Sequence, residues 1–331
     1  MAIKAGNFFK QQLQEKPQEI DLDAPKKKPG KKPGKVPLLK FSDHAKKLNI
    51  STDFCLITEL HCEMSGHDPD RPYHRLHASD VTNQDIEFCP RERALLIATE
   101  AEQKTRYIST ETRTYFDIGE AYHDLVREKW GVNVSYGNWA CLGCKHVVER
   151  SSKPDACPKC GNKNLKYDEL RVKSADTSIS CGIDWQVFNY KLDEAIAVEI
   201  KSINADEFKK LVAPHVEHRV RTRLYLHSIA NAEKPEEVEH LRTDLAMIIY
   251  VSKGAPDEGE YLGGSGFTEK KSPFKNFIVK RDDIEIEDYL NKGRQLKAFL
   301  AGGNLPEKIC KTSSDKRAAS CAMCDQCWSK A

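Results

Sequence analysis

The sequence lacks any long apolar run. No stretch of its 331 residues approaches the ~18 to 20 apolar residues that a membrane helix needs. The N-terminus also lacks the apolar segment of a secretory signal, so we expect the protein to remain in the cytoplasm. Net charge is low as well, at +2, which neither requires nor excludes nucleic acid, because a binding groove can be basic while the remaining surface is acidic. With 39% hydrophobic and 31% charged residues, the chain is expected to be soluble and globular.

Cysteine, by contrast, is plentiful, with 12 residues. The cysteines are clustered in a long chain that has no recognisable secretory signal. In a reducing compartment such clusters bind metal more often than they form disulfides. The sequence therefore favours metal centres over a disulfide framework.

The first fifty residues differ in composition from the rest. The segment 25–37 reads PKKKPGKKPGKVP and holds six lysines among prolines and glycines, so it can form neither a helix nor a strand ladder. We predict that residues 1–50 form a disordered basic arm, either merely solvated or adding non-specific phosphate contacts. Residues 51–331 are expected to form the folded domain.

The remaining chain alternates helical and strand-like patterns, which predicts an α/β fold with a mixed sheet flanked by helices. One predicted helix begins with Asp117 as its cap and runs to Trp130. A helical stretch from Asp206 is interrupted at Pro214 and resumes through about Ala230. The other expected elements are strands at 179–190, 195–203, 245–251 and 276–280, and a helix at 283–301.

The first two of these strands form a predicted hairpin that brings charged residues together. A turn centred between Lys191 and Leu192 sets residues whose numbers sum to 383 opposite each other, which pairs Asp184 with Glu199. Lys201 lies two residues further and therefore on the same face. Two facing carboxylates repel unless a cation lies between them, and Mg²⁺ prefers oxygen ligands of this kind.

These residue types suit metal-assisted hydrolysis of a phosphodiester. Asp184 and Glu199 would hold the metal, which lowers the pKa of its bound water. Lys201 would orient or help to deprotonate that water, or stabilise charge on the phosphate. His123 would add a neutral imidazole ligand. Alone, however, a Glu-x-Lys strand is usually a solvated face, and a single helical histidine is more often a surface or core residue.

The order of these motifs along the chain is more specific than any one of them. It runs Gly119-x-x-x-His123, then Gly182-x-Asp184, then Glu199-x-Lys201, then a helix that contains Tyr225. This order resembles the PD-(D/E)XK nuclease superfamily, in its RecB-like branch.

The resemblance implies a restriction-endonuclease-like core and gives each motif a role. It implies that His123, Asp184 and Glu199 bind Mg²⁺ or Mn²⁺, with the backbone carbonyl of Ile200 as a further ligand, and that Lys201 is catalytic. The family usually continues with Gln-x-x-x-Tyr on a helix that touches DNA near the scissile bond. Here Tyr225 matches the tyrosine, but Arg221 replaces the glutamine and would contact phosphate.

A first cysteine set predicts a zinc ribbon. Cys141, Cys144, Cys157 and Cys160 form two Cys-x-x-Cys knuckles twelve residues apart, which matches a tetrahedral Zn²⁺ site. The module, over residues 138–170, falls between the His123 helix and the Asp184 strand, so it is expected to be an insertion in the nuclease domain. Its role is either structural or the gripping of DNA or a partner through a modest basic face made by Lys145, His146, Arg150 and Lys153.

A second cysteine set is dispersed, with Cys89 before the catalytic motifs and Cys310, Cys321, Cys324 and Cys327 near the C-terminus. This arrangement resembles the iron–sulfur subgroup of RecB-like nucleases, which includes the AddB nuclease domain, CRISPR-adaptation nucleases and phage exonucleases. The resemblance implies a 4Fe–4S cluster that ties the ends of the domain together, held by Cys89, Cys310, Cys321 and Cys327, with Cys324 as the spare. A set without Cys310 and a Zn²⁺ site remain alternatives.

Three cysteines remain outside these sets. Cys55 and Cys62 lie near His61 and His67, and we interpret them as unpaired buried thiols, with another metal site as the alternative. Cys181 is predicted to be a small core residue.

The resemblance implies a Mg²⁺- or Mn²⁺-dependent deoxyribonuclease. We expect an exonuclease, of the phage type, that resects DNA ends or single strands in recombination, repair or replication and passes a strand to an annealing protein. If the chain is phage-encoded, it would act in the host cytoplasm. The alternatives are a structure-specific endonuclease and a non-catalytic nucleic-acid-binding protein that uses the zinc ribbon and the lysine arm.

Overall fold

The computed structural model describes residues 56–69, 72–102, 105–189, 193–254, 261–262, 268–269 and 272–329. The chain divides into two units, Met1–Thr58 and Glu59–Ala331. The predicted basic arm at 1–50 lies outside the described residues. The account below concerns the second unit.

A seven-stranded mixed sheet forms the centre of this unit. Its strand order is β14-β11-β10-β9-β4-β5, with β6 also paired to β4. Only the β10–β11 pair is parallel. The strands span β4 Ser135–Cys141, β5 Val147–Ser151, β6 Leu165–Asp168, β9 Trp185–Asn189, β10 Glu194–Ile203, β11 Leu245–Ser252 and β14 Phe274–Lys280. The prediction of a mixed α/β fold is thus confirmed.

The predicted register of the hairpin is confirmed between β9 and β10. Ala195 pairs with Phe188 and Val198 with Trp185, so each pair of residue numbers sums to 383. The centre of the turn lies outside the described residues. Asp184 directly precedes β9, so it lies one residue beyond the Val198–Trp185 pair, which is the last pair of the ladder.

A second, three-stranded sheet corrects the prediction of one continuous strand at 179–190. The chain forms β8 (Ile179–Ile183), breaks at Asp184, and then enters β9 in the central sheet. β8 pairs with β2 (Leu76–His77) and with β7 (Leu170–Lys173). The strand was predicted as continuous because both halves carry apolar residues, but each half is buried against a different sheet.

The helix expected at 117–130 begins earlier than predicted. α5 spans Thr110–Asp124, and the side chain of Ser109 caps it by accepting a hydrogen bond from the Thr112 backbone N–H (3.2 Å). Asp117 is therefore an interior residue and not the cap. The last six residues, Leu125–Trp130, continue as a π-helix, η1. Such wide turns often accompany functional sites.

Helices cover both faces of β10. Ala195 and Ala197 belong to a core shared with α7 (Val216–Ala230) and α8 (Glu287–Leu300), whereas Val198 and Ile200 belong to a core shared with η1 and the strands β4 and β6. The alternation of β10 thus directs Glu199 and Lys201 toward the α7 face. The helical stretch broken at Pro214 is confirmed as α6 (Ala205–Lys210) followed by α7.

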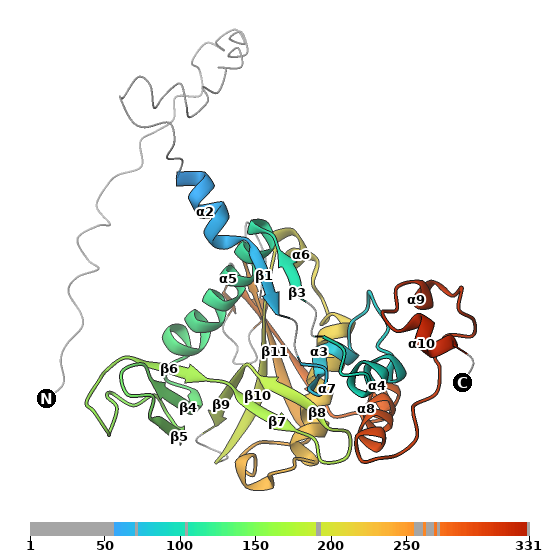
Figure 1. Ribbon diagram of the computed structural model, residues 1–331. Helices are drawn as coiled ribbons and strands as arrows, with labels where there is room; N and C mark the ends of the chain where they lie inside the picture. Colours follow the sequence, from blue (N-terminus) through green and yellow to red (C-terminus); the bar gives the residue numbers. More distant parts are fainter. Residues whose placement is uncertain are drawn as a thin grey trace, which may run out of the picture. The chain divides into compact units, whose positions relative to one another are not determined.

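The C-terminal elements return to an early helix. Figure 1 shows α9 (Lys316–Ala319) and α10 (Cys324–Trp328) beside α4 (Pro90–Ala98). These two C-terminal helices are far from α4 in sequence. Among the residues that the structure describes, no helix combines the length and the apolar character needed to cross a membrane. The remaining elements are α2 Leu56–Met64, β1 Gly66–Pro69, α3 Ala78–Val81, β3 Thr105–Ile108, η2 Pro235–Glu237, β12 Tyr261–Leu262 and β13 Thr268–Glu269.

Candidate active site

Asp184 lies where the chain leaves β8 and enters β9. Beyond Val198, β10 extends past the end of β9, so the edge of β10 is open on that side. The Asp184 carboxylate reaches this edge and accepts a hydrogen bond from the Ile200 backbone N–H (2.9 Å). Only 9% of Asp184 is exposed. The predicted participation of Ile200 through its carbonyl stays a prediction, because the contact observed here is through its N–H.

Three side chains from separate elements converge beside this edge. The ligand atoms of His123, Glu169 and Asp184 all lie within 4.8 Å of one another. His123 comes from α5, and its Nε2 is 4.0 Å from Oδ2 of Asp184. Glu169 comes from the link between β6 and β7. These three residues are called the trio below.

Glu169 was not predicted from the sequence. Its one signal was its place as an acidic residue at the end of the predicted ribbon module, where the chain returns to the core. No spacing to His123 or Asp184 distinguishes it, because all three are brought together only by the folded arrangement of α5, β6 and β8.

A buried arginine fixes this arrangement. Arg127, in η1, is only 3% exposed and donates from Nη1 to Glu169 Oε1 (2.8 Å) and to the backbone carbonyl of Asp184 (2.9 Å). Its Nη2 donates to Asp124 (3.0 Å). The guanidinium thus links η1 to two members of the trio, and it engages only one oxygen of the Glu169 carboxylate.

Glu199 lies deeper and is not part of the trio. It is 1% exposed, its Oε1 is 2.5 Å from Lys201 Nζ, and its Oε2 accepts a hydrogen bond from the Tyr225 hydroxyl (2.6 Å). Nη1 of Arg221 is 3.6 Å from the same Oε1. Both α7 residues expected to contact DNA therefore engage the Glu199 carboxylate, and their roles on DNA stay predictions.

The two carboxylates have opposite electrostatic surroundings. Burial would raise the pKa of Glu199, but the charges of Lys201 and Arg221 outweigh it and lower this pKa to about 2. Burial and the nearby Glu199 raise the pKa of Asp184 well above its ordinary value. Burial also lowers the pKa of His123, which favours the neutral imidazole that binds metal.

An open cleft lies over the trio. Its floor includes the edge of β10, and Lys201, with a side chain 21% exposed, lines it. The remaining lining residues are Tyr115, Phe116, Gly119, Glu120, His123, Arg127, Glu169, Asp184, Ile200, Ser202 and Lys253. A ligand in this cleft would meet the trio and the lysine together.

The four cysteines of the predicted ribbon lie close together at the end of β4 and in the loops that follow it. The sulfurs of Cys141 and Cys160 are 3.6 Å apart, and those of Cys144 and Cys157 are 3.7 Å apart. In each knuckle the residue after the second cysteine has a positive φ, 60° at Lys145 and 71° at Gly161. These four thiols are compatible with a zinc or iron–sulfur site.

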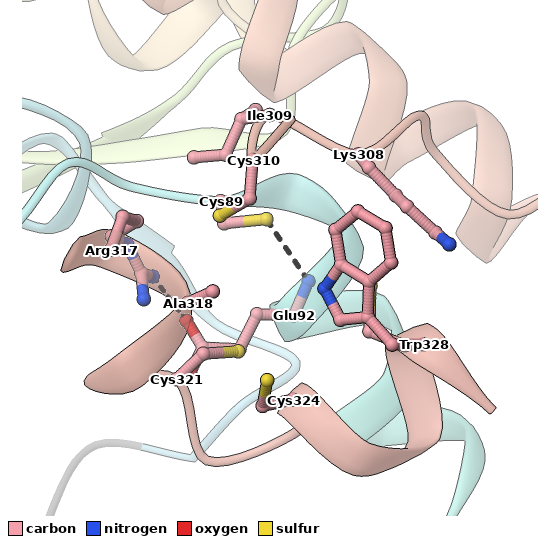
Figure 2. A pocket seen from close by; sticks show the side chains of 11 residues that line it. Cys89, Glu92, Lys308, Ile309, Cys310, Arg317, Ala318, Cys321, Cys324 and Trp328 are labelled. Atoms are coloured by element: carbon pink, nitrogen blue, oxygen red, sulfur yellow. Dashed lines mark hydrogen bonds and ion pairs between the residues drawn. The ribbon is translucent and has the colours of Figure 1, made fainter. Parts of the chain in front are cut away.

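The second cysteine set also converges. Cys89, Cys310, Cys321, Cys324 and Cys327 line one small cavity between α4 and the C-terminal segment. Figure 2 shows Cys89 beside Cys310, with Cys321 and Cys324 across the cavity and the Trp328 ring at its side. We call this group the cysteine cradle. All five cysteines line the cradle, so their positions do not show which one would be left without a role as a ligand.

Contacts around the cradle hold its two halves together. Cys89 caps α4 and its sulfur accepts a hydrogen bond from the Glu92 backbone N–H (3.4 Å). The Glu92 carboxylate pairs with Arg317 and accepts from the Ala322 backbone N–H (2.9 Å). Nε of Arg91 donates to the sulfur of Cys327 (3.3 Å). Burial raises the pKa of Cys321 to about 11.

The remaining cysteines have different environments. Cys181 is fully buried beside Ser228, which confirms its prediction as a core residue. Cys62 is exposed, so its prediction as a buried thiol was wrong: the short helix α2 presents it outward. Cys55 lies outside the described residues.

Comparison of the chain with protein-family models and with curated proteins found no match.

Proposed function

We propose that this protein is a metal-dependent DNA nuclease of the PD-(D/E)XK type, and specifically a RecB-like exonuclease that acts on DNA ends or single strands. The observation that carries this proposal is the trio of His123, Glu169 and Asp184 beside the Glu199–Lys201 pair, at the open edge of β10. An open cleft above these residues gives room for an extended polymer.

The donor set of the trio fits Mn²⁺ or Mg²⁺. One imidazole nitrogen and two carboxylates supply hard ligands from one side, and the open cleft leaves the other side for water and phosphate. The bound cation would supply a Lewis acid and a water of lowered pKa. The raised pKa of Asp184 fits this role, because a carboxylate that lacks its cation holds a proton more tightly.

The chain's own residues would orient the phosphodiester. The Lys201 ammonium, which lines the cleft, would stabilise the charge that develops on the phosphate oxygens. Glu199 holds this ammonium through a contact of 2.5 Å, and Tyr225 and Arg221 in turn fix Glu199. Arg127 keeps Glu169 aligned with the backbone of Asp184.

Of the two groups compatible with the ribbon thiols, we propose zinc. Thiolates about 2.3 Å from one ion at tetrahedral angles stand about 3.8 Å apart. The distances of 3.6 and 3.7 Å are close to this value. Backbone N–H groups of Cys144 and Gly143 lower the pKa of Cys141, whereas the neighbouring thiols raise the pKa of Cys160, so the set favours one thiolate before a metal binds.

We propose a 4Fe–4S cluster for the cysteine cradle. Among the described residues, the ligand atoms of the ribbon cysteines lie within 4.8 Å of one another, and so do those of the trio. The cradle cysteines do not form a group that close. A cluster of four irons is wider than a single ion, so its thiolates stand farther apart than those around zinc. Four of the five cradle cysteines suffice for its ligation.

The test is a comparison of DNA substrates. End-labelled single-stranded, blunt duplex and circular DNA are incubated with the holoprotein and Mg²⁺ or Mn²⁺, and the products are resolved by length. We expect degradation of linear DNA from its ends and no cutting of circles. Cutting of circular DNA would instead favour the structure-specific endonuclease. Binding without any cleavage in either metal would overturn the proposal.

A further inference from the structure

Two large aromatic side chains stand exposed in the cleft beside the trio. Tyr115 and Phe116, on α5, are 57% and 51% exposed, and both line the same cleft as His123. A single exposed ring is ordinary, but two adjacent rings that line one cleft leave a joint apolar surface in water that a partner can cover. Apart from Gly119 and Ile200, the other residues that line the cleft carry polar or charged side chains, so a purely apolar ligand would leave them without partners.

We propose that Tyr115 and Phe116 form a stacking platform for unpaired nucleobases of a single DNA strand whose phosphate lies at the trio. This inference rests on the proposed function and names the form of its substrate. Aromatic side chains stack on the faces of unpaired bases with little sequence preference, because every base has such a face. In a duplex those faces are covered by neighbouring bases, so the platform would select a single strand or a frayed end.

The spacing along α5 fits a strand that runs through the cleft. Phe116 precedes His123 by seven helical residues, which is about 10 Å along the helix axis at about 1.5 Å per residue. A stacked strand advances about 3.4 Å per nucleotide, so the platform would meet a base about three nucleotides from the phosphate at the trio. A more extended strand would place that base about two nucleotides away.

Two lysines in the cleft can meet the phosphates of such a strand, whereas Glu169 and Asp184 need the proposed cation before a phosphate can approach them. The Lys253 ammonium lies 5.6 Å from the centre of the Tyr115 ring, and both residues line the cleft with Lys201. Glu120 is the acidic residue of α5 in the cleft, and its carboxylate is 3.2 Å from the Lys166 ammonium, which offsets its charge. Aromatic rings interleaved with cations are the usual composition of a surface that binds single strands.

The inference is tested by binding without cleavage. The holoprotein is mixed with a fluorescently labelled oligothymidylate, and separately with a blunt duplex, with Ca²⁺ in place of Mg²⁺ or Mn²⁺, and anisotropy gives the affinity. We expect Tyr115→Ala and Phe116→Ala each to weaken single-strand binding about tenfold, with little effect on the duplex. Tyr115→Phe should retain the affinity, whereas Tyr115→Leu, which keeps apolar bulk but has no ring, should not. Tyr107→Ala is the matched control, because Tyr107 is 58% exposed and lies outside the cleft.

A second readout places the base. An oligonucleotide that carries 2-aminopurine two or three nucleotides from the cleaved bond should lose fluorescence on binding the wild type, and regain it with Phe116→Ala. Unchanged single-strand affinity in both alanine variants, or an equal loss for the duplex, would overturn the inference. A protein that binds the oligonucleotide through these rings but cuts no DNA would overturn the proposed function alone. A protein that binds no DNA would overturn both.

Discussion

At the scale of single residues, the buried carboxylates Asp184 and Glu199 differ in how their charge is compensated. Glu199 has Lys201 and Arg221 beside it, which lower its pKa to about 2. It therefore adds stability at pH above about 4.5, and this contribution is lost as the pH falls toward 2. Asp184 has one backbone N–H donor and a raised pKa, so its contribution is present below its ordinary pKa and is lost as the pH rises.

This difference predicts that Asp184→Asn stabilises the metal-free protein at neutral pH. The amide keeps an acceptor for the Ile200 N–H and removes a charge that burial penalises. We expect the unfolding temperature at pH 7 to rise by about 2 °C or more, as followed by circular dichroism. The gain should shrink as the pH falls and wild-type Asp184 becomes protonated. A variant that is less stable than the wild type at pH 7 in the absence of metal would contradict this account.

A second prediction concerns Glu169. Glu169→Gln keeps a polar side chain next to Arg127 but removes a charged ligand from the trio. We expect Mn²⁺ affinity, measured by calorimetry, to fall about tenfold or more. Glu120→Gln is the matched control, since Glu120 lines the same cleft but pairs with Lys166. Equal losses in the two variants would mean that Mn²⁺ responds only to the overall charge of the cleft.

The residues of the candidate site were partly predictable. Asp184, Glu199 and Lys201 were selected because a period of two and the position of the turn fix which side chains share a face, and the register of β9 and β10 follows that rule. Glu169 could not be selected this way. It reaches the trio through Arg127 and the packing of the ribbon, which are contacts between elements that no local pattern encodes.

At the scale of elements, the ribbon and the candidate site share one hydrophobic core. Cys141, Trp139 and Tyr167 from the ribbon strands pack in the same cluster as Trp185 and Ile200. The Tyr167 hydroxyl accepts a hydrogen bond from the Gln186 backbone N–H (3.0 Å), just beyond Asp184. Because Glu169 follows β6 by one residue, the ribbon positions a member of the trio as well as filling the core.

This coupling predicts that losing the ribbon metal damages the distant site. Cys157→Ser removes one of four thiolates, and we expect it to lose about one zinc per chain, measured by elemental analysis. Mn²⁺ affinity at the trio should fall about tenfold, since ribbon packing orients Glu169. Cys62→Ser, at an exposed cysteine, serves as the control. Zinc loss with unchanged Mn²⁺ affinity would show that the ribbon acts independently of the trio.

Elements were predicted less accurately at their ends than at their centres. The start of α5 was placed at Asp117, because Asp117 and Glu120 imitate a capping box, whereas Ser109 is the actual cap. The break at Asp184 was missed for a different reason. Apolar periodicity reports that a segment is buried, but not which neighbouring strands bury it, and here β8 and β9 belong to different sheets.

At the scale of the whole folded unit, the cysteine cradle joins segments that are distant in sequence. More than 200 residues separate Cys89 from Cys310, and both line the cradle. Closing so long a loop removes much conformational freedom from the unfolded chain. The contacts of Glu92 with Arg317 and with the Ala322 backbone hold the same two segments without a cluster.

The cradle therefore predicts an iron-containing protein. Anaerobically purified protein should be brown, contain iron and absorb at about 400 nm. Cys89→Ser should lose the brown colour and unfold at a lower temperature than the wild type. Cys324→Ser, at the predicted spare cysteine, should keep the colour and the unfolding temperature of the wild type. A colourless wild-type protein with zinc in place of iron would overturn the assignment.

The most direct test of the nuclease proposal is Mg²⁺-dependent cleavage of an end-labelled DNA strand by the wild type and by Glu199→Gln. Glu199 is fully buried and holds Lys201 at 2.5 Å, so the amide should leave the ammonium without its charged partner. The account predicts that the wild type degrades the strand and that Glu199→Gln is inactive although it stays folded and binds the same DNA. Normal cleavage by Glu199→Gln, or no cleavage by the wild type with either Mg²⁺ or Mn²⁺, would contradict it.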